Sequence, residues 1–179
     1  PVIVFACATC ENMFNKYLPE LKRISVYELM SKAGLRPESS LSGTYTVFDP
    51  CAAREDSDMR SAVRSLSEGA GVLLEEIKDG CRCCGYGGHI QVPEPQLFDQ
   101  ISDNRAKASD KPYIVYCANC REVFAARGKE SRHILDVYFG NEIQGVPTLK
   151  QKRENALRLK KELLKEKWDM DVTYEVRPW

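Results

Sequence analysis

The chain has 179 residues, 43% of them hydrophobic, and its 26 Lys and Arg residues balance 26 Asp and Glu residues. That length allows one ordinary domain, or two small lobes, with a buried core. A net charge of zero argues against nucleic acid or an anionic membrane surface as a partner, and the apolar runs are too short to span a membrane. The eight cysteines come without a secretory leader, which favours metal or redox chemistry in the reducing cytoplasm over a disulfide scaffold. Because the chain opens on Pro1 rather than Met, we expect it to be an excerpt of a longer protein.

The first part of the chain is expected to form one strand and two helices. Residues 2–6 are β-branched and aromatic, which predicts a short buried strand. Helices are expected over residues 11–21, where Pro19 must shorten or kink the helix, and over about 26–33. The polar loop 34–43 then separates this part from the next.

The following part alternates strands with helices. Strands are expected over residues 44–48 and 113–116, with a weak helical pattern over 94–108. The helical anchors are Met59, Val63, Leu66 and Ala70 in one amphipathic helix, and Leu97 and Ile101 in the weaker one. Such alternation is typical of an α/β fold with a mainly parallel sheet and flanking helices.

Three cysteines directly follow predicted strands. They are Cys7, Cys51 and Cys117. In open parallel sheets, ligands bind at the carboxyl ends of the strands. We therefore expect Cys51 to lie on one side of the sheet with the later cysteines, close enough to share a site.

The chain contains an internal repeat. A shift of 110 residues lays residues 7–10 (Cys-Ala-Thr-Cys) on residues 117–120 (Cys-Ala-Asn-Cys). The unit of strand, Cys-x-x-Cys, helix and short helix thus occurs twice. Residues 1–34 are interpreted as the C-terminal part of a preceding repeat, and residues 44–140 as a complete one.

The match between the copies continues after a two-residue adjustment. Glu28 then falls on Asp136, and His133 stands where Ser25 stands, at the start of the short helix. This position indicates a capping or packing role for His133.

Residues 149–168 predict a long helix of different character, with eight Lys or Arg residues against three Glu. Two apolar stripes run along it, one formed by Ala156, Leu159 and Leu163 and the other by Leu157, Leu164 and Trp168. The helix either docks by these stripes or offers its basic face to an acidic partner, and both interpretations stay open.

The densest chemical signal is the segment Cys81-Arg82-Cys83-Cys84-Gly85-Tyr86-Gly87-Gly88. Adjacent thiols cannot easily form a relaxed disulfide with each other, but they can present two sulfurs to one metal centre. Together with Cys51 and the second Cys-x-x-Cys, they give five thiolates, more than tetrahedral zinc or an ordinary cubane cluster requires. The surplus implies sulfur that bridges two irons, or a site that rearranges.

These residues resemble the cysteine-rich CCG domain, as found in the B-type subunit of heterodisulfide reductase and in related iron–sulfur oxidoreductases. The resemblance covers about residues 44–140 and rests on Cys51, Cys83-Cys84-Gly85 and Cys117-x-x-Cys120. It implies that these five cysteines hold a non-cubane [4Fe-4S] cluster, which cleaves or forms disulfides of small thiol cofactors by electron transfer.

The segments Asp49-Pro50-Cys51 and Tyr116-Cys117, with the basic tail, look most like the version appended to flavin-dependent pyridine nucleotide–disulfide oxidoreductases. That likeness implies FAD and NAD in parent domains, and a flavoprotein domain or an electron-transfer subunit as partner. The chain itself shows no dinucleotide-binding fingerprint.

Within the motif, Cys83 and Cys84 lie in a glycine-flanked loop that can shift, so we expect one of them to be the catalytic, exchangeable ligand. Cys7, Cys10 and Cys81 are further candidate ligands or spare thiols. His89 follows the glycine loop closely enough to be a zinc ligand or a neighbour of the cluster. A structural zinc module and a metal-free dithiol oxidoreductase remain as alternative functions.

Overall fold

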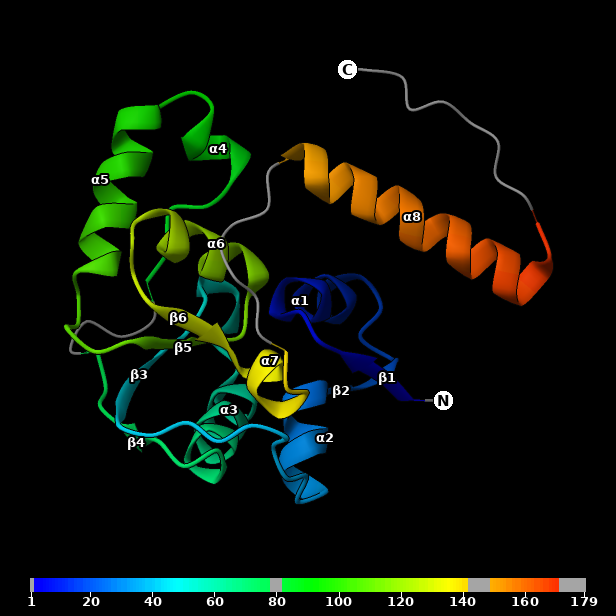
Figure 1. Ribbon diagram of the computed structural model, residues 1–179, viewed down its shortest axis with the longest axis horizontal. Coiled ribbons are helices and arrows are strands. Elements are labelled where there is room, and N and C mark those ends of the chain that lie inside the picture. The colour runs from blue at the N-terminus through cyan, green and yellow to red at the C-terminus, as the bar shows by residue number, and fades with distance from the viewer. Residues whose placement is uncertain (1, 78–81, 142–148, 171–179) are drawn as a thin grey trace. The chain divides into compact units, whose positions relative to one another are not determined.

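The computed structural model describes residues 2–77, 82–141 and 149–170 (Figure 1). The chain divides into two compact units, residues 1–144 and 145–179. Cys81 lies outside the described residues.

The larger unit contains two sheets with parallel pairing throughout the described strands. A two-stranded sheet joins β1 (Val2–Phe5) to β2 (Lys22–Ser25). The four-stranded sheet has the order β4-β3-β5-β6, from β3 (Thr44–Phe48), β4 (Leu73–Leu74), β5 (Tyr113–Val115) and β6 (Ser131–His133). The predicted α/β class with a mainly parallel sheet is confirmed.

The register of β3 and β5 places two cysteine segments next to each other. Phe48, the last residue of β3, pairs with Val115, the last residue of β5. Cys51 and Cys117 follow these two strand ends within three residues. Since the strands are parallel, both segments leave the sheet at the same edge.

Both copies of the repeat fold alike. The first is β1, α1 (Ala8–Tyr17), β2 and α2 (Val26–Lys32); the second is β5, α6 (Ala118–Ala126), β6 and α7 (Ile134–Tyr138). Cys7 and Cys117 are the residues before α1 and α6, with nearly equal φ and ψ of −130° and 116° against −133° and 120°. Because the extended cysteine starts each helix, α1 begins three residues earlier than predicted.

The predicted role of His133 is confirmed. The Nδ1 atom of His133 accepts a hydrogen bond from the Leu135 N–H at 3.3 Å, at the start of α7. Ser25 does the same for α2, where its Oγ accepts from the Glu28 N–H at 3.1 Å. Two different side chains thus each satisfy one orphan donor of a helix start, the third residue of α2 and the second of α7.

The described residues of the larger unit form four further helices. They are the short 3₁₀ helix η1 (Cys51–Ala53), α3 (Ser57–Gly69), α4 (Gly88–Gln91) and α5 (Pro95–Ala106). Figure 1 shows α3 on one side of the four-stranded sheet and α6 on the other. The Asp56 side chain caps α3 by accepting from the Met59 N–H at 2.9 Å.

The core occupies both faces of the sheet, because successive strand residues point to opposite faces. One cluster includes Val47 and Ile114 with Met59, Val63 and Leu66 of α3. The other includes the neighbouring strand residues Phe48 and Val115 with Tyr113, Val123, Phe124, Cys84 and Cys120. Two cysteines of the motif are therefore part of the packed interior.

Two details of the predicted core were wrong. Leu97 does not anchor α5, since 45% of it is exposed; the helix buries Ser102 and Ala106 instead, one turn apart on another face. The predicted strand at residues 2–6 exists, but only Phe5 of β1 is buried, while Val2 and Val4 are exposed.

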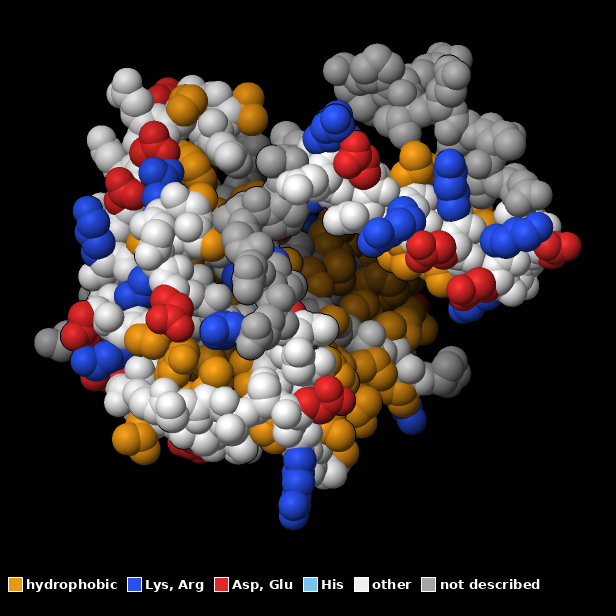
Figure 2. Space-filling view, viewed as in Figure 1, with side chains coloured by type: hydrophobic (Ala, Val, Ile, Leu, Met, Phe, Trp, Pro, Cys, Tyr) orange, Lys and Arg blue, Asp and Glu red, His pale blue; other side chains and the backbone are white. Residues whose placement is uncertain are grey.

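The smaller unit contains α8 (Leu149–Trp168), which matches the predicted helix. Figure 2 shows basic and acidic side chains interspersed along it. Leu159, Leu163 and Trp168 are exposed. Among the helices in the described ranges, none combines the length and apolar character needed to cross a bilayer.

Candidate metal centre

Cys84 and Cys120 meet in the interior although 36 residues separate them in sequence. The Cys120 Sγ donates a hydrogen bond to the Cys84 Sγ over 3.2 Å, and the two residues are 3% and 5% exposed. Phe48, Tyr113 and Phe124 pack around them in the same cluster. The two sulfurs are therefore shielded from water by aromatic side chains.

Cys117 completes a set of three sulfurs. Its pKa is lowered to about 6, first by a hydrogen bond from the Cys120 thiol, against the effect of burial, and further by backbone N–H groups at the start of α6. The same thiol lowers the pKa of Cys84, while donating to both neighbours raises the pKa of Cys120 itself. The lowered pKa values of Cys84 and Cys117 shift both groups toward the thiolate, which is the metal-binding form.

Cys83 lies beside this set in a tight glycine loop. Its Sγ accepts a hydrogen bond from the Gly85 N–H at 3.3 Å. Gly85 has φ +93°, and a Cβ there would stand 3.2 Å from Phe98 Cδ2 and 3.3 Å from Ile101 Cγ2. The loop can therefore lie against α5 only with glycine at this position.

Cys51 is exposed at the start of η1. Its neighbours Pro50 and Ala52 line a cavity of about 300 Å³ together with Cys117 and Asn119. The structure thus brings the backbone around Cys51 to the second Cys-x-x-Cys. The sulfurs of Cys84 and Cys117 are both linked to that of Cys120 by hydrogen bonds.

The first Cys-x-x-Cys faces the same cavity. Cys7 and Thr9 line it opposite Cys117 and Asn119, their equivalents in the second copy. Cys7 and Cys10 are exposed, and a hydrogen bond with Cys7 is the main cause that raises the pKa of Cys10. Two matching helix starts thus converge on one pocket.

Neither histidine lies among the gathered sulfurs. His89 is exposed on α4. His133 lines the cavity and caps α7, and burial lowers its pKa to about 4, so its imidazole is neutral at pH 7.

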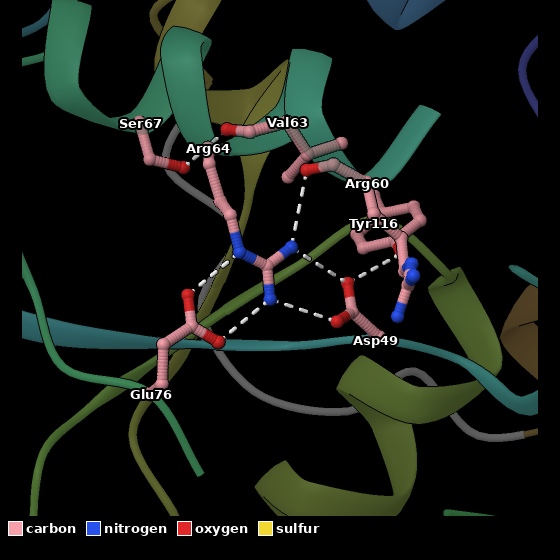
Figure 3. Close-up of polar contacts among 7 residues, drawn as sticks. All are labelled: Asp49, Arg60, Val63, Arg64, Ser67, Glu76 and Tyr116. Carbon is pink, nitrogen blue, oxygen red and sulfur yellow. Dashed lines mark hydrogen bonds and ion pairs between the residues drawn. The ribbon is translucent and has the colours of Figure 1, made fainter. Parts of the chain in front are cut away.

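A polar network that the sequence analysis missed holds the strand ends (Figure 3). Arg64 of α3 binds the Asp49 carboxylate through both terminal nitrogens, at 2.9 and 3.2 Å. Its Nε and Nη2 bind the Glu76 carboxylate at 2.6 and 2.8 Å. The Tyr116 hydroxyl donates to Asp49 Oδ1 at 2.6 Å.

This network joins the segments that carry the cysteines. Asp49 stands two residues before Cys51, and Tyr116 stands directly before Cys117. Hydrogen bonds from Arg64 are the first cause that lowers the pKa of Glu76, so this carboxylate stays charged. The sequence shows an acidic residue, Asp49, directly after a buried strand, but nothing in it identifies Arg64 or Glu76 as the partners.

The thiols fit an iron–sulfur group in their chemistry. Thiolates are the ligands that such clusters prefer, and two of the three gathered sulfurs have a lowered pKa. In the described part of the chain, no group of three or more His, Cys, Asp or Glu side chains is arranged to hold a single metal ion. The sulfurs of Cys84 and Cys117 are instead linked to that of Cys120 by hydrogen bonds.

Known proteins are similar to this chain in sequence. Residues 45–125 match the family model of the CCG cysteine-rich domain. An uncharacterised iron–sulfur protein of Methanocaldococcus jannaschii is 28% identical over 142 residues, covering 75% of this chain and 26% of that protein. The glycolate oxidase iron–sulfur subunit of Escherichia coli is 29% identical, covering 49% of this chain and 23% of the subunit.

A third relative is one of the subunits of the dihydromethanophenazine:CoB–CoM heterodisulfide reductase of Methanosarcina acetivorans. It is 28% identical, covering 59% of this chain and 29% of that relative. The chain thus spans between 23% and 29% of the length of these three relatives. No solved structure matches the chain. Residues 45–125 thus match the CCG cysteine-rich domain, the family that the sequence resembles, and a heterodisulfide reductase subunit is among the similar proteins.

Proposed function

We propose that this chain is the iron–sulfur redox module of a larger oxidoreductase, and that it moves electrons to or from a disulfide or thiol substrate. The contact between the Cys84 and Cys120 sulfurs, with Cys117 bonded to the same thiol, carries this proposal. The names of the relatives support it, since heterodisulfide reductase and glycolate oxidase are both redox enzymes with such subunits.

In this proposal, Cys51, Cys83, Cys84, Cys117 and Cys120 hold a [4Fe-4S] cluster, which supplies one-electron chemistry when bound. The residues of the chain fix its surroundings. Cys84 and Cys120 lie in a dry aromatic cluster, so charge on their sulfurs is screened little by water. The backbone N–H groups at the start of α6 hydrogen-bond the Cys117 thiolate.

The cavity of about 300 Å³ beside Cys117 is the proposed place for the sulfur substrate. It is large enough for a small thiol and carries few polar groups, among them Thr9, Asn119 and the neutral His133. Cys83 and Cys84 both lie in the glycine loop, so one of them would be the ligand that exchanges with a substrate sulfur. Electrons then come from, or go to, a flavoprotein domain or an electron-transfer subunit in the reducing cytoplasm.

One anaerobic preparation tests the proposal. We expect iron and acid-labile sulfide in equal amounts, about four of each per chain, together with broad visible absorption that bleaches in air. Stoichiometric zinc without colour would instead establish a structural zinc module. A colourless, metal-free protein with one reactive Cys-x-x-Cys would establish the dithiol alternative.

A further inference from the structure

A second pocket, away from the gathered sulfurs, carries a concentration of negative charge. It has a volume of about 600 Å³ and lies at the first copy of the repeat, beside α1, β2 and the start of α3. The carboxylates that line it are Glu11, Glu20, Glu28, Glu55, Asp56 and Asp58. Lys22 and Arg23 are the basic residues among its lining.

Glu11 is the unusual member of this acidic pocket. It is only 8% exposed, and its Oε2 atom is buried without a hydrogen-bond partner. A buried carboxylate oxygen without a partner is costly and rare in folded proteins. Burial, and then the negative charges of Asp56 and Glu28, raise the pKa of Glu11, while Arg23 opposes them.

The second copy of the repeat shows which group this position accommodates. The 110-residue shift lays Glu11 on Arg121. Arg121 forms an ion pair of 3.0 Å with Asp136, and both side chains are largely buried. Glu28 stands where Asp136 stands, so the first copy keeps the acid of this pair and replaces its guanidinium by another carboxylate.

The partners of the neighbouring acids place no hydrogen-bond donor on the Glu11 Oε2 atom. One oxygen of Glu28 completes the capping box of α2, and the other meets the exposed Lys32 at 3.3 Å. The Asp56 side chain caps α3. Arg23 is near enough for its charge to oppose the rise in the pKa of Glu11, but the Oε2 atom has no hydrogen-bond donor. At this oxygen the first copy therefore lacks the hydrogen-bonded guanidinium that Arg121 supplies in the second copy.

We propose that the acidic pocket binds an organic cation, a guanidinium or ammonium group seated between Glu11 and Glu28. A guanidinium matches the geometry of a carboxylate by paired hydrogen bonds. A metal ion suits the pocket less, because the described side chains include no group of three or more donors arranged to hold one. The inference rests on the carboxylates alone and is independent of any iron–sulfur cluster.

The cation comes either from a free small molecule or from an Arg side chain of a partner protein. Two probes separate these sources: agmatine, and a blocked Gly-Arg-Gly peptide, each titrated into the 179-residue chain by calorimetry at fixed ionic strength. We expect saturable binding of at least one probe. The tighter probe assigns the source, and binding of neither overturns the proposal.

Variants locate the site. Glu11→Gln keeps the size and removes the charge, so we expect affinity to fall at least about tenfold, equivalent to about 1.4 kcal/mol. The matched control Glu68→Gln, exposed on α3 outside the pocket, should bind within about twofold of the parent chain. Equal affinity in Glu11→Gln and the parent would refute the proposal, as would Mg²⁺ binding with the same dependence on Glu11.

The repeat offers a third variant. Glu11→Arg recreates the Arg121–Asp136 pair in the first copy, so it should abolish binding of both probes and raise the melting temperature. A chain with this substitution that still binds agmatine as tightly as the parent would contradict the assignment. If the larger arginine of Glu11→Arg disturbs folding, Glu11→Gln still tests the proposal, because glutamine is nearly isosteric with glutamate.

Discussion

Cys7 and Cys117 start their helices with almost the same backbone angles, yet their thiols differ in surroundings. Cys120, the partner of Cys117, is buried and also meets Cys84, whereas Cys10, the partner of Cys7, is exposed. The third sulfur changes the chemistry, because a hydrogen bond with Cys120 lowers the pKa of Cys84 as well as that of Cys117. The second Cys-x-x-Cys is therefore a candidate metal centre because Cys84 lies next to it, whereas the first has no such neighbour among the contacts of the described residues.

The five proposed ligands should not be equivalent. Cys117 and Cys120 are fixed by β5 and α6, so Cys→Ser at either should remove the iron. Cys83 or Cys84, in the glycine loop, should be the exchangeable ligand, and its substitution should leave much of the iron while abolishing disulfide turnover by the intact parent enzyme. Iron content and turnover, measured for five single variants, check this. Equal loss of iron at all five positions would exclude an exchangeable ligand.

His133 should make stability depend on pH. Its pKa falls from 6.5 to about 4 on folding because of burial, so the unfolded chain binds the proton more readily between these values. The contribution is fully present above about pH 6.5 and is lost as the pH falls toward 4. The shift corresponds to roughly 3 kcal/mol, and to about 2 kcal/mol after allowance for partial exposure.

Urea unfolding of the metal-free chain at pH 7 and pH 4.5 measures this loss. The control is His133→Ser, which borrows the capping residue of the first copy, Ser25, and cannot titrate. The loss of stability on acidification should be smaller in His133→Ser by about 2 kcal/mol. An identical loss in both chains would show that other groups carry the pH dependence.

At the scale of the elements, Arg64 fastens α3 to the end of β3 and to the segment after β4. The Asp49 side chain is 8% exposed, so removing its cation leaves a largely buried carboxylate with the Tyr116 hydroxyl. Arg64→Met should therefore cost about 2 kcal/mol, less than a fully buried pair, because the Glu76 side chain is 59% exposed.

The network also sets the spacing of the cysteine segments, so its loss should change the cluster as well as the fold. We expect the metal-loaded Arg64→Met protein to show a shifted reduction potential and faster iron loss to a chelator. Arg64→Lys is the conservative comparison, since a single ammonium cannot bind both carboxylates in paired geometry. A chain with lowered stability but an unchanged potential would confine Arg64 to a structural role.

The sequence predicted the strands that form the core far better than those at the edges. Residues 44–48 were predicted to the residue, because a run of β-branched and aromatic side chains is buried on both faces. The strands β2 and β6 were missed, since Lys22–Ser25 and Ser131–His133 are short and polar. Their pairing is imposed by the sheet rather than by local preference.

The candidate site was predictable to the same degree. Cysteines after parallel strands predicted the common edge, and the structure places Cys84, Cys117 and Cys120 together there. The Arg64 network was not predictable, because it depends on side chains from α3 and two strand ends meeting in space. The acidic pocket at Glu11 could not be recognised from the sequence alone. It was identified by comparing the two copies of the repeat and by the burial of the Glu11 Oε2 atom in the structure.

At the scale of the whole molecule, the buried hydrophobic residues of the described chain lie between Phe5 and Tyr138. The larger unit therefore has a complete core of its own, on both faces of its sheet. A chain ending at Gln144 should keep its melting temperature within about 2 °C of the full chain, since 1 kcal/mol corresponds to roughly 2–4 °C at this size. It should also bind the same amount of iron.

This truncation decides between the two interpretations of α8. If the helix serves an acidic partner, its removal leaves the stability of the larger unit unchanged, and the basic residues are needed only when that partner is present. A loss of more than about 5 °C would show instead that residues 145–179 stabilise the larger unit through the apolar stripes. The double variant Leu159→Ser, Leu163→Ser in the full chain then reproduces the loss without shortening the protein, because both side chains lie on one stripe and are exposed on α8.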